Sequence, residues 1–259
     1  MNKVFCIISC FFVFAAFGQT EETADETMQT DETAAVEESA SEPEPEYDAG
    51  PNDAGVVRSI LDANNMADVQ IDVVAAFSAG RVIRLNLNNQ DIGRQGLTVL
   101  PPEIGKLSAL VDLSIDDNDL VQLPDELGNC RALVKISIRN NSIMSLPSTI
   151  GNLSELQEID MRNNELTTLP MEIGLLGKLW KLQLWGNNIR TLPETFGSLR
   201  SLRELYLRGN RLTTFPVSVL KLKLNYIDIQ DNRLCKPPGA IDNWLKKFDD
   251  KYRSWQKCW

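Results

Sequence analysis

Six side chains of the kinds that dominate binding surfaces recur in this chain at a single interval. Four of them follow one another at steps of 23 residues, and the other two are also 23 residues apart. Aromatic rings and guanidinium groups offer a large contact area, a polar handle and cation–π contacts. We therefore predict that a partner-binding patch is formed by Arg139, Arg162, Gln183, Trp185, Tyr206 and Arg208. The alternative is that Trp185 only packs against the neighbouring arginines.

Residues suited to catalysis are scarce. The 259-residue chain contains no histidine, which excludes Ser-His-Asp and Cys-His sites and most zinc hydrolase sites. It also lacks a phosphate-cradling glycine loop, a Cys-x-x-Cys pair and a Gly-x-Ser-x-Gly motif. The adjacent carboxylates Asp116 and Asp117 fall on opposite or adjoining faces of their segment. We expect a protein that is not an enzyme and that uses no metal and no other cofactor.

The negative charge of the chain is concentrated in one segment. Between Gln19 and Gly55 there are 13 acidic residues and no Lys or Arg, whereas residues 56–259 hold 25 bases and 23 acids. The formal net charge of −10 therefore belongs to this segment. A nearly neutral body lacks the concentrated basic face that nucleic-acid binding needs, so we expect no nucleic-acid partner.

A repeat accounts for the common interval of the six binding residues. The string L-x-x-L-x-L-x-x-N-x-L recurs every 23 residues, with one final step of 22, and the spacers between copies repeat as well, as in LPSTIGNL and LPMEIGLL. An upstream copy has Gln90 in the asparagine position, which brings the number of copies to seven. The repeated asparagines are Asn118, Asn141, Asn164, Asn187, Asn210 and Asn232.

This pattern resembles the leucine-rich repeat family, in its 23-residue subtype LPxxIGxLxxLxxLxLxxNxL, as found in exported bacterial proteins. The resemblance covers residues 82–234 and is specific, because spacing, asparagine and spacer recur together. It implies an α/β solenoid, a right-handed superhelix that forms a curved arc with parallel strands on its concave face. It also implies a protein that recognises another protein through that face.

The residues support the same architecture on physical grounds. Apolar residues such as Leu182 and Leu184 alternate with polar ones, which is typical of a short strand with one buried face. One repeat buries about seven apolar side chains, at about 1.5–3 kcal/mol each, while ordering its backbone costs at least as much, at about 1–2 kcal/mol per residue. Stacked repeats share one continuous core. The buried asparagine amides can satisfy backbone groups where each strand bends away, and together they form a structural asparagine ladder.

The stack needs a cap at each end. Two amphipathic stretches between residues 53 and 80 predict a helical cap over the first repeat. After the last repeat, apolar side chains at three- and four-residue spacings predict a helix that covers the open core, namely Ile241, Trp244, Leu245, Phe248, Tyr252 and Trp255. The domain boundaries that follow are an N-terminal cap at 55–81, repeats at 82–234 and a C-terminal cap at 235–259.

The first residues carry the features of an export signal. Residues 1–18 have one cation, an apolar middle and small residues at the end, which predicts a cleaved signal peptide too short to span a bilayer. Cys10 also lies in a sequence similar to a lipoprotein box, but the apolar residues after it argue against a lipid anchor there. The acidic stretch 19–54 has little to bury and is expected to be a disordered tail. The protein is thus expected to be secreted, periplasmic or at the cell surface.

The three remaining cysteines have structural interpretations. Cys130 occupies a spacer position that other repeats fill with leucine, so we expect a buried, inert thiol. Cys235 and Cys258 bracket the C-terminal cap, and export to an oxidising compartment predicts a disulfide between them.

The outward positions of the strands suggest two further features. The third motif position alternates in charge along Arg84, Asp112, Lys135, Glu158, Lys181 and Glu204, which predicts lateral ion pairs between neighbouring strands. An acidic zone is expected near the first repeats at Asp91, Asp112, Asp116, Asp117 and Asp119. This zone would either bind a cation or a basic ligand or simply be solvated.

Together these observations predict a monomeric, non-catalytic protein that binds an unidentified protein ligand on its concave face and has no membrane span. The alternative is a carbohydrate or cell-wall binding module, in which Trp185 and Tyr206 stack on sugar rings.

Overall fold

The computed structural model describes residues 52–93 and 96–258, all of which belong to the second of two compact units, Tyr47–Trp259. The predicted signal peptide at 1–18, Cys10 and nearly all of the acidic tail at 19–54 lie outside the described residues. The six predicted binding residues, the asparagines, the N-terminal cap and the C-terminal cap as far as Cys258 are described.

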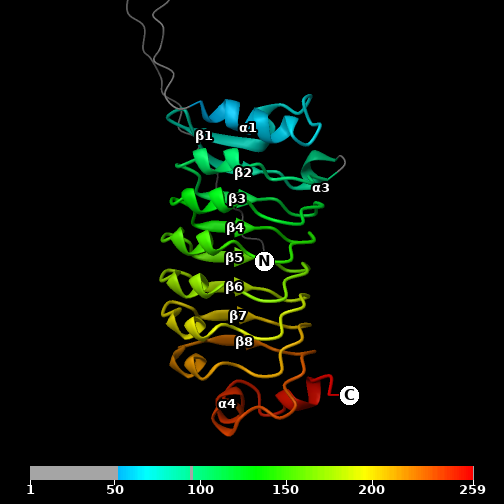
Figure 1. Ribbon diagram of the computed structural model, residues 1–259, viewed down its shortest axis with the longest axis vertical. Coiled ribbons are helices and arrows are strands. Elements are labelled where there is room, and N and C mark those ends of the chain that lie inside the picture. The colour runs from blue at the N-terminus through cyan, green and yellow to red at the C-terminus, as the bar shows by residue number, and fades with distance from the viewer. Residues whose placement is uncertain (1–51, 94–95, 259) are drawn as a thin grey trace, which may run out of the picture. The chain divides into compact units, whose positions relative to one another are not determined.

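Eight strands form one sheet in the order in which they occur in the chain. All neighbours from β2 to β8 are parallel and in register, so that Leu182 of one strand lies beside Leu205 of the next. The strands are β1 (Ala75–Ser78), β2 (Arg81–Asn86), β3 (Asp112–Ser114), β4 (Lys135–Ser137), β5 (Glu158–Asp160), β6 (Lys181–Gln183), β7 (Glu204–Tyr206) and β8 (Tyr226–Asp228). Successive repeats are stacked along one axis (Figure 1).

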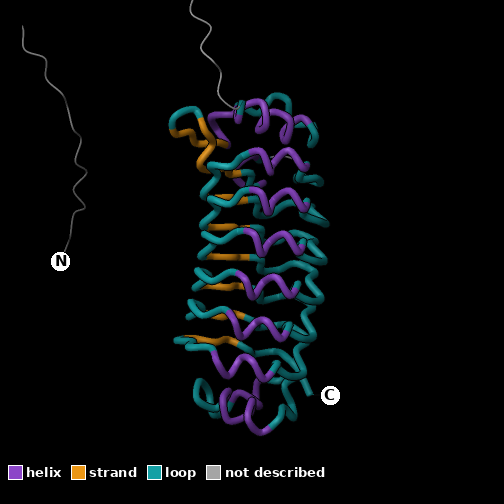
Figure 2. The backbone as a smooth tube through the Cα atoms, turned by 60° about the vertical axis from the view of Figure 1, so that its left-hand side comes forward, coloured by secondary structure: helices purple, strands orange, loops and turns teal. Residues whose placement is uncertain are grey.

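A short 3-10 helix returns the chain in each repeat and lies on a different side of the stack from the strands (Figure 2). Each begins after the proline at the second position of the spacer, which is in extended conformation and fixes φ at the turn. The glycine of the spacer allows close stacking, since a Cβ on Gly197 would lie 2.2 Å from the Ser218 carbonyl oxygen. These helices are η1 (Pro102–Lys106), η2 (Asp125–Asn129), η3 (Ser148–Asn152), η4 (Met171–Leu175), η5 (Glu194–Ser198) and η6 (Val217–Lys221).

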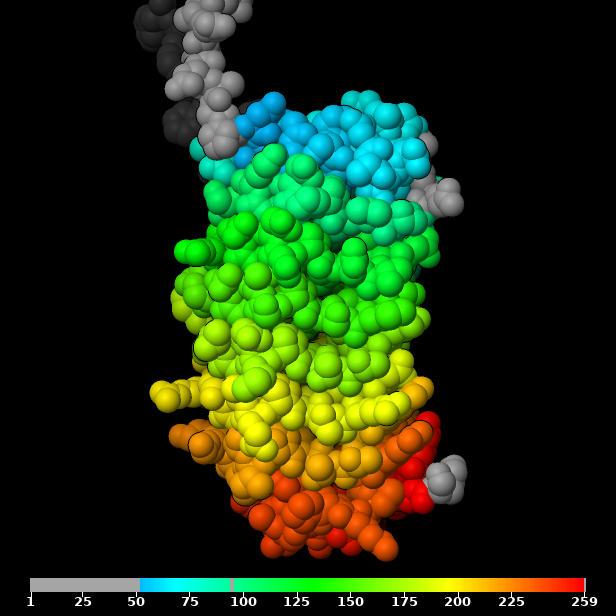
Figure 3. Space-filling view, in the orientation of Figure 1, coloured from blue at the N-terminus to red at the C-terminus, as the bar shows by residue number. Residues whose placement is uncertain are grey.

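The aliphatic positions of all repeats form a single core that runs the length of the stack. Leu182 and Leu184, the strand residues singled out above, are 1% and 0% exposed. The repeats are in contact from the first to the last without a break (Figure 3). The predicted class is confirmed: the protein is a leucine-rich repeat solenoid with parallel strands along one side.

The six repeated asparagines are buried, none more than 8% exposed. Asn187 shows what each one does. Its amide nitrogen donates to the carbonyls of Met161, at 2.9 Å, and Leu184, at 3.0 Å. Its amide oxygen accepts from the backbone N–H of Leu166 at 3.0 Å. Each asparagine therefore ties its own repeat to the preceding ones through groups that would otherwise be buried without a partner.

The ladder differs from expectation at both ends. Gln90 does not take the asparagine role, because it lies exposed in the short helix α3 (Asn89–Ile92). At the other end, Gln256 adds a rung that the spacing did not predict. Its side chain accepts from the N–H of Leu234 at 3.2 Å and donates to the carbonyls of Ile229 and Tyr252. The spacing of this last copy is irregular, and the glutamine side chain is one methylene longer than that of asparagine.

The N-terminal cap is only partly helical. Helix α1 (Asp53–Asp62) covers the first repeat with Val57, Ile60 and Leu61 buried, as expected. The second predicted helix is wrong beyond its first turn, since α2 (Ile71–Val74) gives way to β1, which pairs antiparallel with β2. The reversal uses positive φ angles at Ala79 and Gly80. The added strand covers the free edge of the first parallel strand, which a helix would leave unpaired.

The C-terminal cap consists of two short helices instead of the predicted continuous one. Helix α4 (Gly239–Leu245) and the 3-10 helix η7 (Tyr252–Trp255) are separated by a turn in which Asp249 accepts from the N–H of Lys251. Trp244 packs edge-on against Phe215, with ring centroids 5.8 Å apart, so α4 does close the core. Trp255 does not, because it is 52% exposed.

The cysteines are placed as the sequence predicts. A disulfide joins Cys235 and Cys258, with the two Cα atoms 5.8 Å apart. Cys130 is fully buried, and its thiol donates to the carbonyl of Ile104. Burial raises the pKa of this thiol to about 12, which keeps it protonated and unreactive.

Candidate ligand-binding surface

The outward side chains of β2–β8 and of the residues that follow each strand form one continuous surface, called the strand face below. Charges at the third motif position pair only in part. Arg84 lies 3.5 Å from Asp112, and Lys181 lies 3.3 Å from Glu204. Within residues 52–93 and 96–258, Lys135 and Glu158 form no ion pair. The predicted lateral ion pairs are therefore present at both ends of the series and, among the described residues, absent at Lys135 and Glu158.

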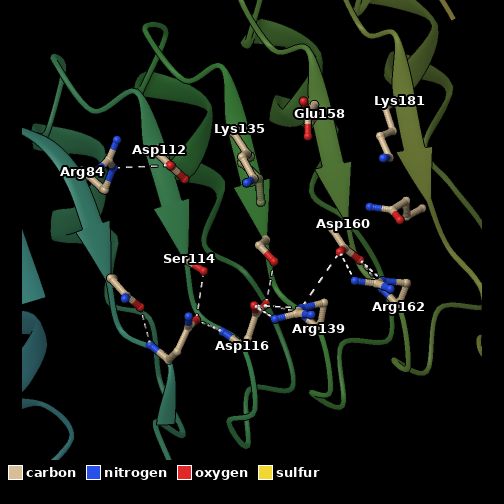
Figure 4. Close-up of a pocket in the computed structure, with 15 residues that line it drawn as sticks. Arg84, Asp112, Ser114, Asp116, Lys135, Arg139, Glu158, Asp160, Arg162 and Lys181 are labelled. Carbon is tan, nitrogen blue, oxygen red and sulfur yellow. Dashed lines mark hydrogen bonds and ion pairs between the residues drawn. The ribbon is translucent and has the colours of Figure 1, made fainter. Parts of the chain in front are cut away.

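A polar groove of about 640 Å³ runs along the strand face from β2 to β6 (Figure 4). Asp116 is its best-connected residue. The Asp116 carboxylate accepts from the hydroxyl of Ser137 at 2.7 Å and from Nε and Nη2 of Arg139 at 2.9 and 2.7 Å. Asp116 is only 2% exposed. The hydrogen bond with Asp116 is also the main reason that the pKa of Arg139 is raised.

The predicted acidic zone is solvated only in part, since Asp91 and Asp119 are exposed, whereas Asp116 is buried. Asp116 is buried against Arg139, one repeat further along, and Asp112 pairs with Arg84. Asp91 accepts from the side chains of Asn86 and Asn88, and Asp117 accepts from that of Asn140. In the part of the chain that the structure describes, no cluster of three His, Cys, Asp or Glu side chains could hold a metal ion. The carboxylates of Asp91, Asp112, Asp116 and Asp117 thus take part in hydrogen bonds and ion pairs with neighbouring polar side chains.

Two of the six predicted binding residues are already engaged inside this network. Arg139 binds Asp116, and Arg162 contacts both carboxylate oxygens of Asp160 at 2.7 Å. Asp160 is also 4.0 Å from Arg139, which links the two arginines through one carboxylate. The guanidinium of Arg162 lies 5.6 Å from the ring centroid of Trp185. These arginines therefore position neighbouring side chains and lie in the polar groove, together with Gln183.

The other three predicted residues line a second groove of about 590 Å³. In this aromatic groove, Trp185 and Tyr206 are both half-buried and Arg208 is exposed. Asp228 on β8 completes the wall. The six residues thus divide between two adjoining grooves instead of forming one patch.

Contacts within the protein fix the ring of Tyr206. It lies 5.0 Å from the ring of Tyr226 and 5.7 Å from Nζ of Lys181, while its hydroxyl donates to Glu204 at 3.1 Å. Burial, followed by the hydrogen bond to Glu204, raises the pKa of Tyr206. Nε of Arg208 donates to Asp231 at 3.1 Å. A ligand therefore meets a groove wall that is already ordered.

Two glycines form the floor of the aromatic groove. Gly186 and Gly209 occupy the turn position at which the preceding repeats have Asp117, Asn140 and Asn163, and all five residues have positive φ. Asparagine and aspartate tolerate this conformation, but their side chains occupy the surface, whereas glycine leaves it open. The change from Asn to Gly beside Trp185 is the sequence signal that could have located this groove.

The comparisons with known proteins agree with this architecture. Residues 125–205 match the leucine-rich repeat region family, and residues 178–234 match the leucine rich repeat family. Together with the repeats and the fold, these matches identify the chain as a member of the leucine-rich repeat family. Comparison with curated protein sequences found no match.

Several solved structures are similar to this chain. A leucine-rich repeat protein of Leptospira interrogans is 34% identical over 59% of this chain and 45% of its own length, with a TM-score of 0.45. The ectodomain of the receptor kinase GASSHO1/SCHENGEN3 from Arabidopsis thaliana is 26% identical over 61% of this chain and 20% of its own, with a TM-score of 0.51. A plant ice-binding protein shares the fold at 24% identity and a TM-score of 0.61, over 70% of this chain and 64% of its own. This chain thus spans less than two thirds of each of these proteins.

Within the described residues, no helix is both long enough and apolar enough to cross a bilayer.

Proposed function

We propose that this chain is an exported, non-catalytic leucine-rich repeat protein that binds a polypeptide ligand on its strand face, at the aromatic groove. The observation that carries this proposal is the groove itself. Trp185 and Tyr206 present ring surface over a glycine floor, and Arg208 and Asp228 supply charge of both signs at the rim. Aromatic and arginine side chains in a preformed pocket are the residue types on which protein interfaces depend most.

The polar groove supports a second part of the same proposal. Most of its charged groups are held by internal ion pairs, as at Asp116 and Arg139, so few of its side chains need to be ordered when a ligand binds. Ordering side chains at an interface costs affinity, and a preorganised surface avoids that cost. We infer that the polar groove sets the ligand's register and that the aromatic groove supplies most of the affinity.

Two findings support an exported ligand-binding role. The Cys235–Cys258 disulfide is typical of proteins in oxidising compartments, in keeping with the signal peptide expected at residues 1–18. The GASSHO1/SCHENGEN3 ectodomain, which shares this fold, was solved in complex with CASPARIAN STRIP INTEGRITY FACTOR 2.

The alternative function is carbohydrate or cell-wall binding at the same groove. Aromatic rings beside polar groups such as those of Gln183 and Asp228 also suit a sugar, which stacks on a ring and forms hydrogen bonds at its edge. The two candidates differ in the ligand and share Trp185.

A crosslinking pull-down with the full chain, run beside a glycan array, separates them. We expect Trp185→Ala to reduce capture of a surface or secreted protein about tenfold or more. Met171→Ala is the matched control, because Met171 is 62% exposed on η4, away from the strand face. Sugar binding that disappears in Trp185→Ala would favour the alternative. Unchanged protein capture by Trp185→Ala would contradict the proposed site.

A further inference from the structure

Within the described residues, no strand pairs with the outer edge of β8, the last strand of the sheet. In the preceding repeats, the backbone N–H two residues after the strand's central position donates to the next strand, as from Leu184 to Tyr206 at 2.8 Å and from Leu207 to Asp228 at 2.7 Å. The equivalent N–H, that of Ile229, has no acceptor among residues 52–93 and 96–258. Ile229 as a whole residue is 6% exposed. An unpaired N–H at the edge of a sheet is a template for pairing with a further strand.

Pairing resumes immediately beyond this point. The backbone N–H of Asp231 donates to the carbonyl of Trp255 at 2.9 Å, and the backbone N–H of Lys257 donates to the carbonyl of Asn232 at 2.7 Å. Together with the rung made by Gln256, these bonds show that residues 255–257 continue the stack beside residues 231–232. Residues 255–257 therefore rebuild the asparagine turn of a further repeat, but residues 235–258 supply no strand beside β8.

The missing strand leaves a groove of about 280 Å³ between β8 and the C-terminal cap, called the β8 edge groove below. The exposure of Ile227, the central residue of β8, shows that this edge is open. The central residues of β6 and β7, Leu182 and Leu205, are 1% and 0% exposed, whereas Ile227 of β8 is half-buried. The residues that line the groove and matter to the argument are Tyr226, Ile227, Asp228, Phe248, Asp249 and Trp255.

The walls of this groove are aromatic and acidic. Tyr226 and Trp255 are 47% and 52% exposed. Asp228 and Asp249 contribute carboxylates, and no Lys or Arg is among the described lining residues. No ion pair involves either carboxylate within the described part of the chain. Carboxylates attract a cation, and ring faces add a cation–π contact to it.

We propose that the β8 edge binds an extended segment of a partner polypeptide, which adds to the sheet as a ninth strand and places a Lys or Arg side chain against Tyr226, Trp255 and Asp249. Strand addition satisfies the N–H of Ile229 through main-chain hydrogen bonds, and the walls select a basic side chain. This site is separate from the aromatic groove, although Asp228 lines both.

A labelled heptapeptide, Thr-Val-Lys-Val-Arg-Val-Thr, tests the proposal with the full chain. Fluorescence anisotropy should show saturable binding, and hydrogen exchange should show new protection of the Ile229 amide. In one peptide the backbone amides are N-methylated on one set of alternate residues, and in a second peptide on the other set. Strand addition predicts that one of these peptides binds at least fivefold more weakly and that the other binds like the parent peptide. A version with Glu at both basic positions should bind at least tenfold more weakly.

Variants of the protein locate the site. Asp249→Asn and Trp255→Ala should each weaken peptide binding about threefold or more, and Asp250→Asn, exposed on the same turn, is the matched control. Trp185→Ala should leave binding of this peptide unchanged, which separates this site from the function proposed above. The proposal is overturned if no saturable binding occurs, if the acidic peptide binds equally well, or if light scattering shows that Trp255→Ala instead disrupts a dimer of this chain.

Discussion

Removing one rung of the asparagine ladder tests how the solenoid is held together. Asn187→Ala removes two hydrogen bonds to carbonyls and one from the N–H of Leu166, all within 3.0 Å. Asn187 is 5% exposed, so water cannot readily replace these bonds. At about 1 kcal/mol of net stability for each bond, the free energy of unfolding should fall by about 3 kcal/mol.

Urea unfolding of the full chain, followed by circular dichroism, measures this change. Asn188→Ala is the matched control, because the Asn188 side chain forms no hydrogen bond within the described residues and its backbone bond to Leu166 remains. The control should lie within about 0.5 kcal/mol of the wild type. If Asn187→Ala loses less than about 1 kcal/mol and matches the control, the ladder is not what secures the stack.

Three further predictions concern the cap and the buried thiol. Cys235→Ser should lower the free energy of unfolding by about 2–4 kcal/mol, and reductant should then destabilise the wild type but not the variant; an equal response of both would be inconsistent with the disulfide. Cys130 should not react with a thiol reagent at pH 8 until the protein unfolds, because its pKa is about 12, and rapid labelling of the native protein would contradict its burial. Hydrogen bonds from Lys246 and then Tyr252 lower the pKa of Asp242 from 3.8 to about 2. The stabilisation it provides should be complete above pH 3.8 and disappear as the pH falls through about 2, so Asp242→Asn should be less stable than the wild type at pH 5 and converge with it near pH 2. A constant difference across this range would rule out that coupling.

Periodicity made the repeats predictable from the sequence. Each copy repeats the same local sequence features. The alternation around Leu182 and Leu184 identifies the strand and the core, and the recurring asparagine identifies the turn. The caps lie outside the period, and there local pattern was a weaker guide. Residues 75–78 read as part of an amphipathic helix but form β1, because covering the edge of β2 takes precedence over local preference. The cap around Phe248 divides at a turn that helical spacing does not reveal.

On the candidate surface, the sequence predicted which side chains lie on the strand face but not how they pair. The interval of 23 predicted that Tyr206 lies beside Gln183 on the neighbouring strand and that Trp185 and Arg208 lie close together, in one groove. The burial of Asp116 was missed because its partner, Arg139, lies one repeat away. The same interval that reveals the repeat also identifies that pair, once each outward position is compared with the next copy. The β8 edge groove could not be foreseen, since it depends on how the C-terminal segment docks.

Site-directed photo-crosslinking tests the central claim, that a polypeptide binds at the aromatic groove, most directly. A benzoylphenylalanine side chain in place of Tyr206 keeps an aromatic ring in the groove, and the same group in place of Met171 on η4 serves as the control. The account predicts that the Tyr206 position crosslinks to a polypeptide ligand, that the Met171 position does not, and that Trp185→Ala abolishes the crosslink. Equal crosslinking from both positions, or a crosslink that survives Trp185→Ala, would contradict it.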